Sequence, residues 1–377
     1  MYFDEPRDGS PFSGAENHLL LLIRAQAQQG CVPELVMLVH RHGPQLAAEI
    51  QRLRSCGIAV HTFAFDLPLH GSRHRKLMLA IRLINRLQKF LRQRRESVIH
   101  THLPHADILG TLAARVAGCR RVVSSTHNNE PSHTTWKWQL VHRILGRITQ
   151  YHIAISDAVR EHLVRVAAVT EDRIATIPYG IPRPQVAADR QTARRMFGID
   201  RDAFVVGFVG RLVRQKNIPV LLRAIARHPQ VECVIAGHGE LEAELRATAT
   251  DLGIENVRFL GHVPQAPQLM PALDVLCLPS HWEGLGLVLI EAMLLGVPVI
   301  GSRSGAIPEV LGNGQFGMLF DADDDQALGE ILKQAQRNPK YLSDLGHRAR
   351  QRAEDVFAVS RMVERTTSVY HRVHQLA

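Results

Sequence analysis

The chain lacks the features of a membrane-spanning, secreted or disulfide-stabilised protein. Its 377 residues contain no run of about 18 uncharged apolar residues, which excludes a transmembrane helix. The five cysteines are scattered and form no C-x-x-C pair, which indicates reduced, mainly structural thiols. The first residues, Met-Tyr-Phe-Asp-Glu-Pro, show no basic stretch followed by an apolar one, so secretion is not expected. We therefore expect a cytoplasmic protein.

Aromatic residues are also scarce, at 5% of the chain, but the apolar content of 45% is ample for burial. A chain of this length is too long for one ordinary core, so two domains are expected. We find no internal repeat, low-complexity tract or coiled-coil heptad. These absences exclude solenoids and fibrous proteins and leave a globular protein of two domains.

The excess of positive over negative charge is confined to the first half of the chain. Residues 1–185 hold 24 Lys and Arg against 14 Asp and Glu, whereas residues 186–377 hold 21 against 22. An excess of this kind favours an anionic partner. No recognition motif and no interleaving of basic and aromatic residues supports nucleic acid, so we expect none.

Much of this charge lies between Arg73 and Arg95. Apolar residues within this segment follow one helical face: Leu77, Ile81, Ile84, Leu87 and Leu91. A basic amphipathic helix can dock on an anionic membrane surface. The alternative, which we slightly favour for the apolar stripe itself, is a surface helix that packs this stripe on its own sheet.

Short β-rich runs alternate with helical stretches, as in parallel α/β folds. A stiff Pro-rich segment, Pro178-Tyr-Gly-Ile-Pro-Arg-Pro184, separates two series of such runs. We expect two doubly wound Rossmann-like domains, residues 1–182 and 183–356, facing each other across a cleft, with a last helix at about 357–377 crossing back to the first domain. The expected strands are 35–40, 59–63, 98–102, 121–125, 152–155, 205–209, 231–236, 257–260, 275–278 and 297–301.

Two glutamates eight residues apart, Glu283 and Glu291, are the most informative feature. A buried strand, Asp274-Val-Leu-Cys-Leu-Pro-Ser280, precedes them, so Glu283 is expected in a loop at a strand's C-terminal end and Glu291 two turns into the next helix. Gly284 and Gly286 would let a ligand approach bare amides at the helix start. The simpler interpretation of these carboxylates is a helix cap and a solvated face.

A second strand end carries cations. In Val205-Val-Gly-Phe-Val-Gly-Arg-Leu-Val-Arg-Gln-Lys-Asn217, Arg211 and Lys216 follow the strand and suit a diphosphate. Taken alone, they are better explained as part of a solvated loop. The glycine spacing fits neither a Walker A loop nor a dinucleotide fingerprint. Gly-rich turns at 236–240 and 301–309 follow two further strands, so four such loops are expected on one rim of the sheet.

Taken together, these segments resemble the family-4 retaining glycosyltransferases of the GT-B fold. The order and spacing of five matches carry the resemblance: Gly-Arg-Leu…Lys at 210–216, Gly-His-Gly-Glu at 237–240, Gly-His-Val at 261–263, the pair 283/291, and Gly-Ala-Ile-Pro-Glu at 305–309. The resemblance covers nearly the whole chain and is most specific in residues 205–310.

The resemblance implies a nucleotide-sugar site in the second domain. Glu291 would accept hydrogen bonds from the ribose hydroxyls, and Glu283 would contact the transferred sugar. Arg211 and Lys216 would neutralise the leaving diphosphate. The further implied contacts are the turn glycines Gly237 and Gly239, the backbone of His262 and Val263 beside the base, and the amides of Gly284, Leu285, Gly286 and Leu287.

For the first domain, the resemblance implies the acceptor side of the reaction. Gly14 would lie against the donor's phosphates, and Ser13 stands where the family usually has a second glycine. His127 matches a family histidine that faces the reacting sugar, where it would donate or accept a hydrogen bond rather than act as nucleophile. A doubly wound domain usually begins with a longer apolar strand, so we expect the first strand to be short or truncated and the true start to lie upstream of Met1.

Two sequences imitate metal sites. His100-Thr-His-Leu-Pro-His105 looks like a hydrolase ligand set but has no accompanying carboxylates. Asp321-Ala-Asp-Asp-Asp325 looks like a metal–diphosphate motif, but it precedes the helix expected at 326–336 and is better explained as a cap. We expect no metal and no cofactor.

We therefore expect a metal-independent retaining glycosyltransferase that uses a UDP-sugar or GDP-sugar. Its acceptor would be a polyprenyl-linked or growing surface glycan, as in exopolysaccharide or lipopolysaccharide synthesis, met at the inner face of the cytoplasmic membrane. The alternatives are a sugar-nucleotide epimerase or hydrolase of the same fold and a non-catalytic carbohydrate-binding relic.

Overall fold

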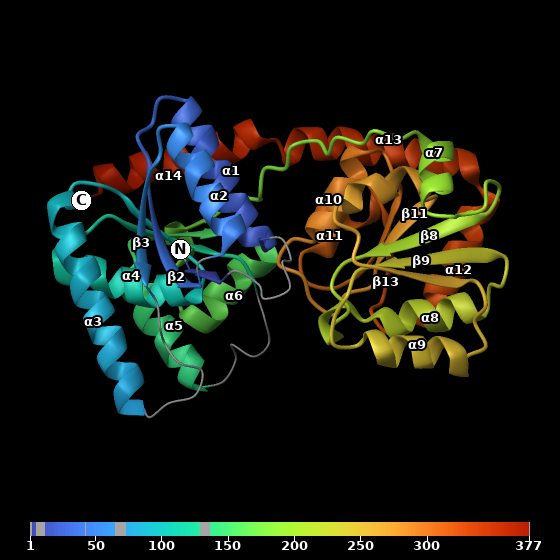
Figure 1. Ribbon diagram of the computed structural model, residues 1–377, viewed down its shortest axis with the longest axis horizontal. Helices are drawn as coiled ribbons and strands as arrows, with labels where there is room; N and C mark the ends of the chain where they lie inside the picture. The colour runs from blue at the N-terminus through green and yellow to red at the C-terminus, as the bar shows by residue number, and fades with distance from the viewer. Residues whose placement is uncertain (1, 5–11, 42, 65–72, 129–135, 377) are drawn as a thin grey trace. The chain divides into compact units, whose positions relative to one another are not determined.

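A computed structural model describes residues 2–4, 12–41, 43–64, 73–128 and 136–376. The chain divides into two compact units, each built of parallel strands and helices (Figure 1). Unit 1 comprises Met1–Gly180 and Val359–Ala377, and unit 2 comprises Ile181–Ala358. The last helix of the chain therefore belongs to the unit that the chain left at Gly180.

Unit 2 contains one six-stranded sheet in the order β10-β9-β8-β11-β12-β13, and all its strand pairs are parallel. The chain starts in the middle at β8, builds one side and then the other, which is the doubly wound pattern. The strands are β8 (Phe204–Val209), β9 (Val231–Ala236), β10 (Val257–Gly261), β11 (Val275–Leu278), β12 (Val299–Ser302) and β13 (Met318–Phe320).

The central strands of this sheet are apolar throughout because helices cover both faces. Val206, Phe208 and Leu276 are completely buried. The helices of unit 2 are α7 (Arg190–Met196), α8 (Ile218–Ala226), α9 (Glu242–Asp251), α10 (Leu287–Leu294), α11 (Ile307–Val310), α12 (Asp325–Arg337) and α13 (Pro339–Val356).

Unit 1 contains two parallel sheets, in the orders β1-β2-β3 and β4-β5-β6-β7. The strands are β1 (Tyr2–Asp4), β2 (Glu34–Arg41), β3 (Ala59–Ala64), β4 (Ile99–His102), β5 (Val122–Thr126), β6 (Tyr151–Ala154) and β7 (Ile174–Thr176). Strand β1 has three residues, so the first strand is short, as predicted.

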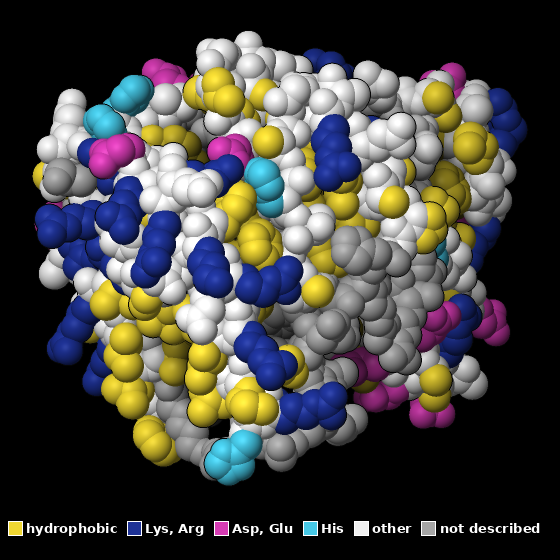
Figure 2. All heavy atoms as spheres, turned by 60° about the vertical axis from the view of Figure 1, so that its left-hand side comes forward, with side chains coloured by type: hydrophobic (Ala, Val, Ile, Leu, Met, Phe, Trp, Pro, Cys, Tyr) yellow, Lys and Arg dark blue, Asp and Glu magenta, His cyan; other side chains and the backbone are white. Residues whose placement is uncertain are grey.

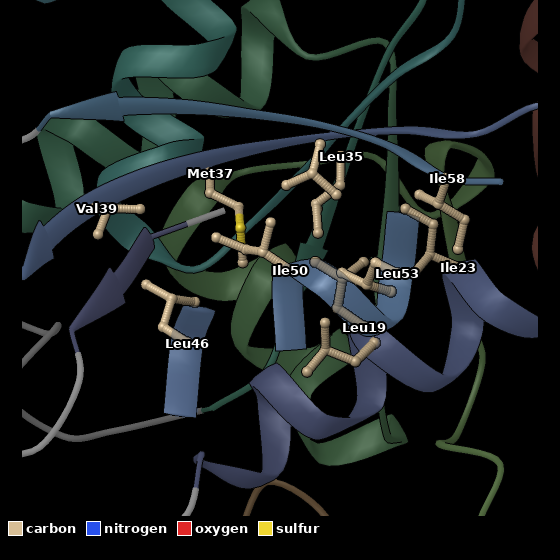
Figure 3. Close-up of a cluster of buried hydrophobic side chains, with 11 residues drawn as sticks. Leu19, Ile23, Leu35, Met37, Val39, Leu46, Ile50, Leu53 and Ile58 are labelled. Carbon is tan, nitrogen blue, oxygen red and sulfur yellow. The ribbon is translucent and has the colours of Figure 1, made fainter. Parts of the chain in front are cut away.

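Helices cover both sheets of unit 1. They are α1 (Gly14–Gln28), α2 (Pro44–Ser55), α3 (Arg73–Leu91), α4 (Pro104–Ala117), α5 (Trp136–Ile148), α6 (Asp157–Ala167) and α14 (Val359–Gln375). Alternate residues of β2, Leu35, Met37 and Val39, point toward α1 and α2, where they form a buried cluster (Figure 3). The residue between them, Leu38, packs on the other face against α3 and α4.

The basic helix α3 corrects one interpretation of the sequence. Leu87 and Leu91 are buried and Ile84 packs against the core, but Leu77 and Ile81 are 60% and 47% exposed. The stripe expected to pack as a whole therefore does so only in its C-terminal half. Figure 2 shows a surface of this side of the molecule on which Lys and Arg side chains lie beside exposed hydrophobic ones.

All ten expected strands are present, with bounds that differ by at most two residues. The sequence interpretation missed two short edge strands, β7 and β13, each of three residues. Edge strands this short carry too few residues to establish an alternating pattern.

Candidate active site

The candidate site of unit 2 is built on the C-terminal ends of its parallel strands. Because these strands run in the same direction, the loops that follow β8, β9, β10, β11 and β12 leave the sheet at one edge. Arg211 and Lys216 follow β8, Gly237 and Gly239 follow β9, His262 and Val263 follow β10, and Glu283 follows β11. The structure therefore places these predicted residues on one rim.

Lys216 and Glu283 form an ion pair. Nζ of Lys216 lies 2.5 Å from Oε1 of Glu283, and the hydroxyl of Ser280 donates to the same oxygen at 2.7 Å. Ser280 is completely buried and Glu283 is 6% exposed. A carboxylate this buried is tolerated because a cation and a hydroxyl compensate its charge. The pairing brings Lys216, which was predicted to bind the diphosphate, into direct contact with Glu283, which was predicted to bind the sugar.

Backbone contacts fix the loop that carries Glu283. The amide of His281 donates to the carbonyl of Gln215 at 2.8 Å, and the side-chain amide of Gln215 donates to the carbonyl of Trp282 at 2.8 Å. Gly305 adopts a φ of +55°, and a Cβ there would lie 2.5 Å from the carbonyl oxygen of Glu283. The loops after β8 and β12 thus both hold the loop that carries Glu283.

The turn after β9 packs against the loop after β8. A Cβ on Gly237 would lie 1.8 Å from the carbonyl oxygen of Gly210, and one on Gly239 would lie 2.3 Å from that of Leu212. The amide of Leu212 donates to the carbonyl of His238 at 2.8 Å. This close approach of two backbones explains why glycine stands at both 237 and 239. The contact of these glycines with a ligand stays a prediction.

Glu291 lies in α10, which starts after Gly286 in a left-handed conformation with φ +78° and has no side-chain cap. The amide of Leu289 donates to the carbonyl of Gly286, so only the amides at the very start of the helix, at Leu287 and Val288, could receive an anion. Leu285 is 3% exposed, so only its backbone could meet a ligand. Burial raises the pKa of the Glu291 carboxyl to about 7, so its charge state is set by what binds beside it.

In unit 1, His127 follows β5 and is held by two side chains. Its Nδ1 lies 2.5 Å from the hydroxyl of Tyr179, and its Nε2 lies 3.2 Å from Nδ1 of His102. The ring of His18 stacks on Tyr179 with centroids 3.8 Å apart. Both ring nitrogens of His127 thus have partners inside unit 1, so a ligand that used one of them would replace a partner.

This histidine cluster is neutral at pH 7. Burial lowers the pKa of His127 to about 4 and that of His100 to about 3. Burial and neighbouring histidines also hold the pKa values of His18 and His102 well below the ordinary value. Burial raises the pKa of Tyr179, which therefore keeps its proton while its hydroxyl is hydrogen-bonded to His127 Nδ1.

The structure explains both sequences that imitate metal sites. His100 uses Nδ1 with the hydroxyl of Tyr370 at 2.6 Å and Nε2 with Ser125 at 2.8 Å. Asp324 caps α12 by accepting from the amide of Ala327 at 2.8 Å, which confirms the predicted cap. In the described part of the chain, no three His, Cys, Asp or Glu side chains are grouped to hold a metal ion.

The N-terminus of α1 shows why serine replaces the family's usual glycine. Ser13 is the N-cap: its hydroxyl accepts from the amide of Glu16 at 3.4 Å, and the Glu16 carboxylate accepts from the amide of Ser13 at 2.6 Å. This capping box satisfies two donors of the helix start. Gly14, the first helical residue, lies between them.

Sequence reasoning missed the residues that support the site. Gln215 and Tyr179 contact residues that are distant in the sequence, so no local pattern marks them. Ser280 contacts Glu283 three residues later, but both lie in a loop that has no periodic pattern. Tyr179 lies in the Pro-rich segment that we treated only as a linker. The sequence marked Tyr179 only by its position between Pro178 and Gly180.

Two family models match the chain. "Glycosyltransferase Family 4" matches residues 12–183 and "Glycosyl transferases group 1" matches residues 189–352. A phosphatidyl-myo-inositol mannosyltransferase of Mycobacterium leprae is 31% identical over 86% of this chain and 84% of its own. In Escherichia coli, UDP-Gal:alpha-D-GlcNAc-diphosphoundecaprenol alpha-1,3-galactosyltransferase is 28% identical over 75% of this chain and 77% of its own.

Among solved structures, Anabaena Alr3699/HepE in complex with UDP and glucose superposes with a TM-score of 0.80. It is 24% identical and the match covers 98% of this chain and 99% of that one. This likeness shows that the fold is GT-B. The strand-end loops, the family models and the mannosyltransferase relative agree, and the chain belongs to the family-4 glycosyltransferases.

Proposed function

We propose that the protein transfers a sugar from a nucleoside-diphosphate sugar to a lipid-linked or growing surface glycan, with retention of the anomeric configuration. The observation that carries the proposal is the buried contact of Lys216 with Glu283 at the rim of the unit 2 sheet. A site with this cation, an exposed Arg211 and a carboxylate beside them suits a diphosphate joined to a hydroxyl-rich ring.

In the proposed complex, Arg211 and Lys216 bind the diphosphate and stabilise the charge that develops as it leaves. Glu283 and the amides that start α10 bind hydroxyls of the transferred sugar, and Glu291 accepts hydrogen bonds from the ribose. In this complex, the turn at 237–239 lies near the phosphates. The backbone at 262–263 lies beside the base. The donor contacts that the family resemblance implies for His127 and Gly14 stay predictions.

The proposed chemistry needs no protein nucleophile. The acceptor oxygen bonds to the anomeric carbon on the face from which the diphosphate departs, and the acceptor proton passes to the departing phosphate oxygen. Glu283 is paired with Lys216 and Ser280, which suits a binding role. The two cations supply positive charge at the diphosphate, so we propose that the reaction needs no metal ion.

A UDP-sugar is the donor we test first. The Anabaena structure contains UDP and glucose, and the Escherichia coli relative is named for UDP-galactose and a diphosphoundecaprenol acceptor. The basic helix α3, with exposed Leu77, Met78 and Ile81, supports docking on an anionic membrane surface where such an acceptor would be met. In the described residues, no helix has the length and apolar character to cross a bilayer.

The test is a thermal-shift and hydrolysis screen of UDP-, GDP- and ADP-sugars in the presence of a metal chelator. We expect one nucleotide family to stabilise the wild type, Glu291→Ala to abolish this, and Glu255→Ala, an exposed glutamate of unit 2, to leave it intact. Absence of any response from the folded protein would contradict the proposal. Product analysis with and without acceptor then separates transfer from epimerisation or hydrolysis.

A further inference from the structure

Helix α5 of unit 1 is rich in apolar residues, yet none of its large apolar side chains is buried. Trp136, Leu140 and Ile144 follow one another at intervals of four residues, so they lie on one face of the helix. Their side chains are 69%, 53% and 48% exposed. The next helix, α6, is two residues shorter but buries Val159 and Leu163. The fold of unit 1 therefore leaves an apolar face of α5 uncovered.

The opposite face of α5 lies over a cavity instead of a packed core. Trp138, Val141 and Leu145 line this cavity of about 90 Å³, and His152 of β6 lines it from the sheet. Val141 and Leu145 stay half-buried. Protein interiors are close-packed, and core helices normally fill such space with apolar side chains. The apolar residues of the outer face are thus not the back of a tightly packed core helix, and an exposed patch of this kind marks an interaction surface.

Two cations share the outer face with the apolar residues. Arg143 and Arg147 are exposed, and they stand seven residues after Trp136 and Leu140, a spacing that returns to the same side of a helix. Neither α5 nor the basic helix α3 contains an Asp or a Glu. Helix α4 lies between α3 and α5 and contacts both (Figure 1). The whole group of helices therefore favours a partner that is both apolar and anionic.

Charge decides between the two partners that fit an apolar helix face. A second copy of the chain would bring Arg143 and Arg147 of both molecules together, with no carboxylate from either α5 to compensate them. A bilayer offers acyl chains to Leu140 and Ile144, and it offers lipid phosphates to arginine side chains, which extend from the apolar region to the headgroups. Tryptophan is enriched at this same boundary. The composition of the face thus fits an anionic bilayer better than a second copy.

We propose that α5 is an interfacial helix that binds an anionic bilayer surface. Trp136, Leu140 and Ile144 enter the boundary between headgroups and acyl chains, and Arg143 and Arg147 bind lipid phosphates. The basic helix α3 adds positive charge beside it, whereas α5 supplies the inserted aromatic side chain. This inference deepens the proposed function and rests on it for the lipid-linked acceptor.

The place of α5 in the fold relates the bilayer to the candidate site. Helix α5 joins β5 to the parallel strand β6, so it begins at the edge of the sheet where His127 follows β5. The cavity beneath α5 is also lined by His127 and Asn128. A bilayer bound along α5 would therefore bring a lipid-linked acceptor to the side of unit 1 that carries His127.

The first test measures binding to vesicles of phosphatidylcholine and phosphatidylglycerol in equal amounts, without nucleotide. Leu140→Ser combined with Ile144→Ser should lower the partition coefficient at least about tenfold, because two inserted side chains lose their apolar area. The matched control, Met196→Ser combined with Leu252→Ser, removes two exposed apolar residues of unit 2 and should bind like the wild type. Equal binding of the two double variants would overturn the proposal.

The second test uses the three tryptophans of the chain, Trp136, Trp138 and Trp282. Phosphatidylcholine brominated in its acyl chains quenches the fluorescence of indoles that enter the bilayer. We expect quenching in the wild type, and Trp136→Phe should remove at least about half of it. Trp282→Phe should leave the quenching unchanged. No quenching in the wild type, or quenching that Trp136→Phe does not reduce, would overturn the proposal.

Self-association is the competing outcome. A wild-type dimer that the Leu140→Ser, Ile144→Ser variant dissociates, in a protein that does not bind vesicles, would assign the face to a second copy and overturn the proposal. Sedimentation velocity without lipid measures this. The transferase proposal is tested apart from it, by nucleotide binding without vesicles. A wild type that binds vesicles but no nucleotide would contradict the transferase proposal alone, and one that binds nucleotide but no vesicles would contradict this inference alone.

Discussion

Lys216 and Glu283 contact each other at 2.5 Å, and Ser280 donates to the same carboxylate oxygen. The two residues were predicted to bind different parts of one ligand, a diphosphate and a sugar. Their pairing means that an arriving donor competes with, or shares, an existing ion pair. Binding and stability are therefore coupled at this point of the sheet rim.

Replacing Lys216 with methionine should test this coupling. The variant leaves the Glu283 carboxylate buried without its cation, so we expect a loss of about 3–5 kcal/mol in the free energy of unfolding and a fall of at least about 100-fold in kcat/KM. Chemical denaturation and donor turnover measure the two effects. Lys216→Met combined with Glu283→Gln should recover much of the stability and none of the activity; an inactive but fully stable single variant would contradict the buried pair.

Glu291 should make stability depend on pH. Its pKa is raised to about 7 from an ordinary value of 4.5, so the folded state favours the neutral acid. The stabilisation is complete below pH 4.5 and is lost as pH rises through 7. We expect Glu291→Gln to be more stable than the wild type above pH 7, by up to about 3 kcal/mol, and equal to it near pH 4.5. A constant difference across this range would exclude the raised pKa.

The same carboxyl should make nucleotide binding depend on pH. Ionised Glu291 accepts two hydroxyl hydrogen bonds, so the ratio of UDP affinities, wild type to Glu291→Gln, should rise between pH 6 and 8. Taking the ratio cancels titration of the nucleotide itself. Isothermal titration measures it, and a flat ratio would remove the ribose contact from the proposal.

Unit 1 should lose stability in mild acid. His100 and His127 have pKa values of about 3 and 4, and burial likewise lowers that of His152 to about 4. Such groups stabilise the folded state above the ordinary pKa of 6.5 and cease to do so as pH falls toward 4. We expect Tm to fall steeply between pH 6.5 and 4. His100→Gln should make the fall shallower, whereas the exposed His74→Gln should leave it unchanged.

Tyr179→Phe should isolate the support of His127. Loss of the hydroxyl leaves Nδ1 of His127 without its hydrogen-bond partner, at a cost of about 1–3 kcal/mol. If His127 contacts the donor sugar, kcat should fall while the affinity for free UDP stays unchanged, because the nucleotide contacts lie in unit 2. Equal loss of UDP affinity and kcat would instead indicate general destabilisation.

Exposed apolar residues of α3 should contribute to membrane binding. Leu77 and Ile81, which are 60% and 47% exposed, lie in the basic helix α3. Changing both to serine should lower partitioning onto anionic vesicles by at least about tenfold, because each loses a buried apolar side chain. Leu252→Ser, an exposed apolar site in unit 2, is the matched control. If both variants co-sedimented with the vesicles to the same extent, α3 would not be part of the membrane-binding surface.

The sequence predicted the helices and strands well, but it did not predict which side chains contact one another. The rim position of Glu283 followed from strand direction, because parallel strands end at one edge. Its contact with Ser280 required the loop conformation, which no periodicity encodes. The apolar periodicity of α3 predicted the correct buried face of the helix. It did not predict that the N-terminal half extends beyond the core, because a helical pattern does not specify how much of the helix is packed.

The close approach of Gly210 to Gly237 has an evolutionary consequence. The turn after β9 cannot accept a side chain at Gly237 or Gly239, because a Cβ there would meet the backbone of the loop after β8, and Gly305 ties the next loop to Glu283 in the same way. Relatives that select different nucleotides or sugars cannot diverge by reshaping one of these loops alone. Divergence in donor choice should therefore concentrate in outward side chains such as Arg211 and His262, which can vary while the interlocked backbone beneath them is inherited unchanged.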